Sequence, residues 1–450
     1  MEKTQARKSA SFKTDWSEEH FSKLEDSLNG SAGGAYHKFK QKAFERFNSA
    51  GFPTTKNEAW KYTNLQPILK TKFKPAAANA SVDEARLEGC ILGEQKLVRV
   101  FVNGFFSKEL SEKFSNVELP KGIQIQSLAQ AFSSKDAERL FELVKGNDEQ
   151  SEPLVSFNTA LFRDGLHLSV EAGAEIEIPL QLISVTTADS DKTVSHPRFV
   201  VEAAEKSSIK IIEQHYGEEG SGEYLTSSVG HIFAEAEARV EHVKVQKDSE
   251  KACLLSTLKI VQKDKSHVET HLFSLGGQLA RNEVYPVLDG EYCNSVLNGL
   301  TILSDEQHVD NYTLIDHALP NCESNELFKG IYSDKSRGVF GGTIIVRPDA
   351  QKTNAIQSNK SILLSDDASV ETRPQLKIWA DDVKCTHGAT VGQLDEEALF
   401  YLRSRGISKQ DAIGILVDAF ATDVVEQLEN EELVDFLAKE IRSKLARIIS

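Results

Sequence analysis

The sequence has no long apolar run, no cluster of basic residues and little cysteine. No window approaches the ~18 consecutive apolar residues of a membrane-spanning helix, so we expect no membrane partner. Residues 1–16, MEKTQARKSASFKTDW, carry basic side chains without the apolar segment that follows them in a secretory signal. The formal net charge of −16 argues against nucleic acid as a partner, because that binding relies on clustered Lys and Arg.

The five cysteines are odd in number and scattered: Cys90, Cys253, Cys293, Cys322 and Cys385. This pattern is not a disulfide framework and suits a reducing compartment, so we expect a cytoplasmic protein. Cys253, Cys293 and Cys322 are interpreted as small buried apolar residues. The hydrophobic content of 40% and charged content of 27% are typical of a globular chain, and 450 residues predict two or three structural units.

The signature motifs of several common enzyme classes are missing. The chain contains no GxxxxGK[ST], no GxGxxG after an expected strand, no HExxH, no CxxC and no GxSxG. An ATPase, a dehydrogenase, a zinc finger and an α/β-hydrolase are therefore poorly supported. We expect that the chain is not an enzyme.

The spacing of apolar residues divides the chain into three regions. Residues 1–155 mix helical spacing with short strands, residues 156–392 alternate apolar with polar side chains, and residues 393–450 return to helical spacing. Within the first region, LVRVFVNGFFS predicts a hairpin with a type I′ turn at Asn103-Gly104. The fold class is therefore predicted to be mainly β with helical ends.

The β region contains a degenerate repeat. Ile176, Ile209, Val240 and Val268 occupy comparable places in successive strand segments, with a spacing of roughly thirty residues that lies in the range of stacked repeats. The repeat slightly favours a solenoid, but the pattern alone leaves both a solenoid and a large β-sandwich open.

Two further segments have distinctive apolar side chains. NEAWKYT, with Trp60 and Tyr62, is expected to pack the first region against the β region. The apolar stripes after residue 408 are long for so short a segment, so part of the helix predicted over 409–428 should remain uncovered. Val417 and Val425 are our first candidates for exposed positions on it.

The segment KCTHGAT places Cys385 and His387 two residues apart. On a strand, both side chains leave the same face with Cα atoms about 7 Å apart. Thiolate and imidazole suit an iron–sulfur cluster, zinc or copper, although two ligands are too few for a closed site. The pair is also compatible with a packed thiol beside a hydrogen-bonded histidine, or with a Cys385 nucleophile whose base is oriented by Asp381 or Asp382.

Several long segments resemble one protein family. SDKSRGVFGG (333–342), residues 371–408 from ETRPQLKIW to YLRSRGIS, and HALPNCESNELFKGIYSDK (317–335) are similar to the SufB/SufD family of iron–sulfur cluster assembly proteins. The NEAWKYTNL segment and the chain length are closer to the D branch of the family than to the B branch.

This resemblance implies a right-handed parallel β-helix flanked by helical segments. It implies a scaffold that pairs with a SufB-like paralogue, or with itself when isolated, and that binds the SufC ABC-type ATPase through its C-terminal helices. No stably bound cofactor is expected. A transient cluster forms at the interface of the two branches, and the D-branch histidine that binds its metal falls on His387, with Cys385 as its companion. Reduced flavin is associated with such complexes.

In this interpretation His387 and Cys385 form a half-site, which is the part of a cluster site that one subunit supplies. Three alternatives remain beside it. The chain could be a purely structural subunit, an enzyme that uses Cys385 as nucleophile, or the SufB paralogue itself.

Overall fold

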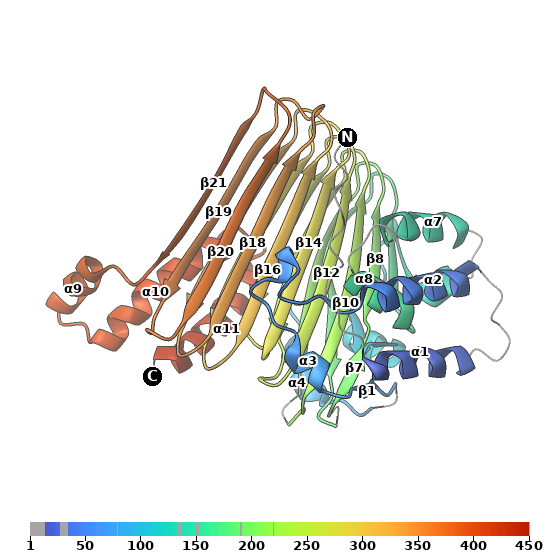
Figure 1. The fold of residues 1–450 in the computed structure, drawn as a ribbon, viewed down its shortest axis with the longest axis horizontal. Coiled ribbons are helices and arrows are strands. Elements are labelled where there is room, and N and C mark those ends of the chain that lie inside the picture. Colours follow the sequence, from blue (N-terminus) through green and yellow to red (C-terminus); the bar gives the residue numbers. More distant parts are fainter. Residues whose placement is uncertain are drawn as a thin grey trace.

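The computed structural model of the chain describes residues 14–27, 35–78, 80–132, 137–148, 153–189, 191–218 and 220–449. It is mainly β, and a parallel β-helix lies between N-terminal and C-terminal helices, as Figure 1 shows. The segment considered above as a possible secretory signal lies almost entirely outside the described residues. In the described part of the chain, no helix is long and apolar enough to cross a membrane.

Two sheets form the walls of the β-helix. In the order of pairing, the first contains β20 (Ser369–Ile378), β18 (Arg337–Val346), β16 (His308–His317), β14 (Leu279–Leu288), β12 (Cys253–Gln262), β10 (Tyr224–Ala234), β8 (Arg198–Ala203), β5 (Leu166–Val170) and β4 (Ile123–Ser127), with β7 (Thr193–Ser195) and β1 (Lys74–Pro75) at its side. The second contains β21 (Lys384–Gly392), β19 (Asn354–Leu363), β17 (Glu323–Tyr332), β15 (Asn294–Leu303), β13 (His267–Ser274), β11 (Arg239–Lys247), β9 (Ser208–Gly217), β6 (Glu175–Thr186), β2 (Leu97–Val102) and β3 (Phe105–Ser107).

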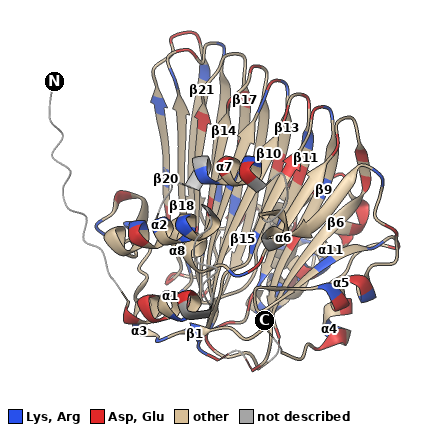
Figure 2. Ribbon diagram, turned by 90° about the vertical axis from the view of Figure 1, so that its right-hand side faces the viewer, with Lys and Arg blue, Asp and Glu red and all other residues tan. Residues whose placement is uncertain are grey.

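The register of these strands confirms the predicted repeat and decides for the solenoid. Ile176 pairs with Ile209, Ile209 with Val240, and Val240 with Val268, all in parallel strands. Because every second residue points inward, aligned positions build columns of buried apolar side chains along the axis. Figure 2 shows charged residues concentrated at the turns and on the helices, while the strands are largely uncharged.

The N-terminal region supplies helices and the first strands of the β-helix. Its helical elements are α1 (Asp15–Ser27), α2 (Ala35–Ala50), η1 (Glu58–Trp60), α3 (Gln66–Lys70), α4 (Glu84–Glu88), α5 (Lys108–Phe114), α6 (Leu128–Ala131), α7 (Ala137–Asp148) and α8 (Pro153–Leu161). The predicted hairpin forms between β2 and β3, and its turn residues Asn103 and Gly104 have φ values of 52° and 83°, as a type I′ turn requires. β2 then pairs with β6, so strands from before residue 155 belong to the sheets.

The NEAWKYT segment packs on the β-helix as predicted. Trp60 is 2% exposed, and the guanidinium of Arg281 on β14 lies 3.8 Å from the centre of its ring. Tyr62 lies 5.6 Å from the guanidinium of Arg373 on β20. Figure 1 shows α1, α2 and α8 along the same side of the β-helix, where α8 contacts β10 and β12.

Three helices follow the last strand: α9 (Glu396–Ser404), α10 (Lys409–Val425) and α11 (Glu431–Ile449). Ser408 caps α10 by accepting a hydrogen bond of 3.1 Å from the backbone N–H of Asp411. α10 and α11 cover the outer face of the second sheet with one shared apolar cluster.

This packing corrects one prediction about exposed positions. Val417 and Val425 are 0% and 4% exposed, because they face the second sheet and α11. The large apolar side chain exposed on α10 is instead that of Ile415, at 48%. Helical spacing had identified an apolar stripe, but not the surface against which it packs.

Candidate functional site

The β-helix ends in two strands, β20 and β21, which we call the terminal rung. Within the described residues, β21 pairs with β19 on one side and with no strand on the other. Figure 1 shows this rung at the free left-hand end of the solenoid. Four large apolar side chains are exposed on the last strands or directly after them: Ile356, Ile378, Trp379 and Val391. An edge strand with uncovered apolar side chains is suited to pairing with another chain.

Cys385 and His387 both belong to the terminal rung. The parallel register places Cys385 beside Ala355 and His387 beside Gln357, and these two partners are 0% and 1% exposed. Aligned residues of a parallel β-helix share a face, so Cys385 and His387 continue two columns of inward-facing residues. The predicted common face is therefore observed, and His387 is exposed because its column ends there.

The surroundings of Cys385 do not resemble those of an activated nucleophile. The side chain is half-buried against an apolar cluster that includes Ala355 and Leu376. Burial raises the pKa of this thiol, which disfavours the thiolate at neutral pH. Of the two carboxylates proposed to orient a base, Asp382 forms an ion pair with Lys352.

The structure leaves the metal-binding set incomplete. No group of three or more His, Cys, Asp or Glu side chains in the described ranges is arranged to hold a metal ion. His308 hydrogen bonds to Thr63 at 3.0 Å, and His317 to Ser324 at 2.9 Å. These two histidines therefore make structural contacts. Cys253, Cys293 and Cys322 are buried, as expected.

A buried acid that the sequence analysis did not single out lies in the same column as His387, two strands earlier in the sheet. Glu326 is adjacent to Gln357 in the same column, and the Gln357 side-chain amide donates a hydrogen bond to its carboxyl group. Complete burial raises the pKa of Glu326 to about 7. The two-residue period of a strand places Glu326 on the same face as Phe328, and an apolar Phe328 could have indicated that this face points inward. Ser324, Glu326 and Phe328 are all buried.

Glu326 should make stability depend on pH. Its pKa of about 7 in the folded chain exceeds the ~4.3 of an unfolded chain, so its favourable contribution is full below that lower pKa and is lost as the pH rises to 7. Glu326→Gln should therefore gain stability over the wild type between pH 4.5 and 8, by roughly 3 kcal/mol at most. Urea unfolding at both pH values measures this. Glu323→Gln, at an exposed position of β17, is the control, and an equal gain there would contradict the assignment.

Fold and site together define a parallel β-helix protein with two candidate metal ligands at an uncovered end. Residues 185–420 match the family model described as "SUF system FeS cluster assembly, SufBD core domain", and residues 14–182 match "SufBD protein N-terminal region". The chain belongs to the SufBD family of iron–sulfur cluster assembly proteins.

Individual relatives agree with this assignment. The iron–sulfur cluster assembly protein SufD of Escherichia coli strain K12 is 31% identical over 90% of this chain and 92% of its own length. An iron–sulfur cluster assembly SufBD family protein of Synechocystis is 32% identical over 86% of both chains. A chloroplastic protein of Arabidopsis thaliana is 28% identical over 94% of this chain and 89% of its own length.

Proposed function

We propose that the chain is a D-type scaffold subunit of a Suf iron–sulfur cluster assembly complex in the cytoplasm. One observation carries this proposal: His387 and Cys385 form an incomplete ligand pair on an exposed terminal rung. A site that has too few ligands in one chain, and that lies beside an unpaired strand edge, is expected of a subunit that shares its site with a partner. The family membership and the likeness to SufD support the same function.

The proposed half-site acts by coordination and not by turnover. The cluster is the cargo, and the neutral imidazole of His387 would donate a nitrogen lone pair to iron while a cysteine of a SufB-like partner supplies a thiolate. The β21 edge would pair with the partner's edge strand, which would exclude water from one side of the cluster. The raised pKa of Cys385 supports only an auxiliary role for that thiol.

The C-terminal helices would bind the SufC ATPase, and α9 is the part best suited to do so. None of its residues is buried, and Phe400 and Tyr401 are 75% and 57% exposed. Large uncovered aromatic side chains at this density are typical of protein interfaces. By contrast, the apolar face of α10 is already occupied by the second sheet.

Phe400→Asp should abolish co-purification with the ATPase and leave pairing with the SufB-like paralogue intact. A charge at the centre of a buried aromatic contact removes its apolar area and introduces an unpaired carboxylate, at a cost of several kcal/mol, on the order of a ≥100-fold loss of affinity. Pull-down from cells that express all three proteins measures it. Leu119→Asp is the control, since Leu119 is also exposed, at 43%, but lies in the N-terminal region. Retention of the ATPase by the Phe400 variant would place the binding surface elsewhere.

A further inference from the structure

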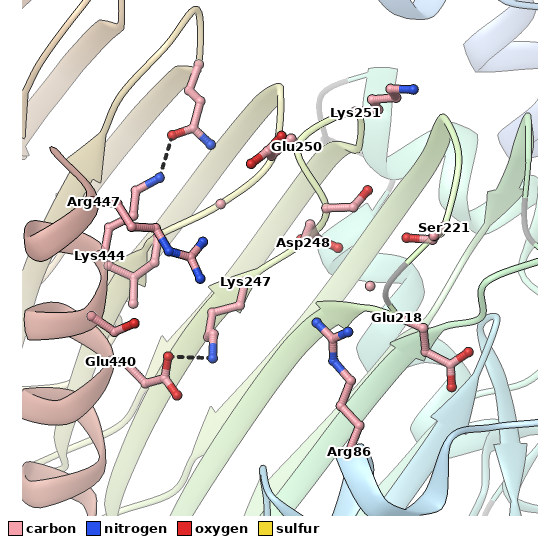
Figure 3. Close-up of a pocket in the computed structure, with 17 residues that line it drawn as sticks. Arg86, Glu218, Ser221, Lys247, Asp248, Glu250, Lys251, Glu440, Lys444 and Arg447 are labelled. Carbon is pink, nitrogen blue, oxygen red and sulfur yellow. Dashed lines mark hydrogen bonds and ion pairs between the residues drawn. The ribbon is translucent and has the colours of Figure 1, made fainter. Parts of the chain in front are cut away.

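A large polar cleft lies away from the terminal rung. It has a volume of about 780 Å³ and is enclosed by α11, by α4, and by the turns that follow β9, β11 and β13. Figure 3 shows Arg86 from α4 and Arg447 from α11 reaching into this space from opposite walls, with Lys247 between them. Neither Cys385 nor His387 lines it.

Cationic side chains outnumber acidic ones in the cleft by one, and three of its four acids already have partners on the protein. Five cationic residues line it (Arg86, Lys247, Lys251, Lys444 and Arg447), against four acidic ones (Glu218, Asp248, Glu250 and Glu440). The carboxylate of Glu218 accepts hydrogen bonds from the backbone N–H groups of Asp83 and Ala188, and that of Asp248 from Tyr224 and Gln246. Glu440 forms an ion pair with Lys247.

Lys444 is the most informative of these cations. Its ammonium donates to the side-chain oxygen of Gln307 at 2.8 Å and to the hydroxyl of Ser304 at 3.4 Å, both of which are neutral. Burial lowers the pKa of this amine, while Asp305, Glu250 and Asp334 oppose that shift from beyond ion-pair distance. A half-buried ammonium whose direct hydrogen-bond partners are all neutral is costly, and a bound anion in contact with it would lower that cost.

The cleft also offers neutral hydrogen-bonding groups. Ser221 and Ser249 line the cleft, and their hydroxyls are buried in its wall without a hydrogen-bond partner among the described residues. A hydroxyl can donate to an anion without adding charge, and buried polar groups are normally paired. Two hydroxyls without partners beside several cations are the arrangement that an oxyanion would complete.

We propose that this cleft binds a small phosphate-bearing anion. Its volume lies within the ~300–1,000 Å³ of small-molecule sites. Phosphate oxygens suit the forked donor of Arg86 and the point charge of Lys444. The chain has a formal net charge of −16, so a lining with five cations and four acids is much less acidic than the chain as a whole.

Binding of pyrophosphate to the full chain tests the proposal, with isothermal titration calorimetry at ~0.15 M salt, where surface charges are screened. We expect one saturable site whose affinity falls at least ~10-fold in Arg86→Gln and further in Arg86→Gln/Lys444→Gln. Lys439→Gln is the matched control, because Lys439 is exposed on the same α11 helix but does not line the cleft. Arg86 is exposed on a short helix, so its single variant should fold.

Three results would overturn the proposal: no saturable binding at millimolar pyrophosphate, an equal loss in Lys439→Gln, or citrate binding as tightly as pyrophosphate. The first would mean that the cations only pair with nearby acids. The second would mean unspecific attraction, and the third would assign the cleft to carboxylates. None of these results bears on the half-site at His387, since the measurement requires neither a cluster nor a partner.

Discussion

His387→Ala should leave the fold intact and eliminate iron–sulfur cluster assembly in cells that depend on this pathway. The imidazole is exposed at the end of its column, so its removal should change the free energy of unfolding by no more than about 0.5 kcal/mol. A histidine that contributed buried hydrogen bonds would instead cost ~1–3 kcal/mol. Growth under obligatory Suf dependence, together with thermal unfolding of the purified variant, separates the two roles.

Two further variants make this experiment specific. Cys385→Ala should be milder, because its half-buried thiol has a raised pKa and the proposed thiolate comes from the partner. His387→Cys should retain part of the function, since a thiolate also binds iron. A loss of growth that follows a loss of stability, or a Cys385 variant that is more severe than the His387 variant, would refute the half-site.

Arg281→Ala should be the most destabilising single change among those considered, at about 3–5 kcal/mol. Arg281 is 0% exposed and pairs with Glu283 and Asp310, both of which are also buried. Its removal would leave two buried carboxylates without their cation and take away the group that lies over the ring of Trp60. Urea unfolding followed by tryptophan fluorescence measures the loss and reports on the contact with the N-terminal region.

An exposed ion pair provides the control for Arg281. Arg347 pairs with Asp316 at 2.7 Å, but its side chain is 51% exposed, so Arg347→Ala should cost less than ~1 kcal/mol. Equal losses in the two variants would show that the buried cluster around Arg281 does not hold the N-terminal region on the β-helix.

Local and periodic features could be predicted from the sequence. The turn at Asn103-Gly104 depends on two neighbouring residues that accept positive φ, and the ladder from Ile176 to Val268 depends on a repeat with a buried face. The common face of Cys385 and His387 follows from the two-residue period of a strand.

Features that depend on distant segments could not be predicted in the same way. The contact of Arg281 with Trp60, and the approach of α4 to α11 across the cleft, join residues whose distance in the chain leaves no periodic pattern. Val417 was misplaced for the same reason, because a helical stripe does not identify its partner. Glu326 lies in an alternating strand, but its raised pKa results from its burial between the neighbouring strands β15 and β19.

Anaerobic cluster reconstitution tests the central claim most directly. Iron, sulfide and visible absorbance are measured for this chain alone, for this chain with its SufB-like paralogue, and for the same pair carrying His387→Ala. The half-site predicts no stable cluster on the chain alone, a cluster on the wild-type pair, and its loss in the His387→Ala pair although that pair still forms. A stoichiometric cluster on the isolated chain, or an undiminished cluster on the His387→Ala pair, would contradict it.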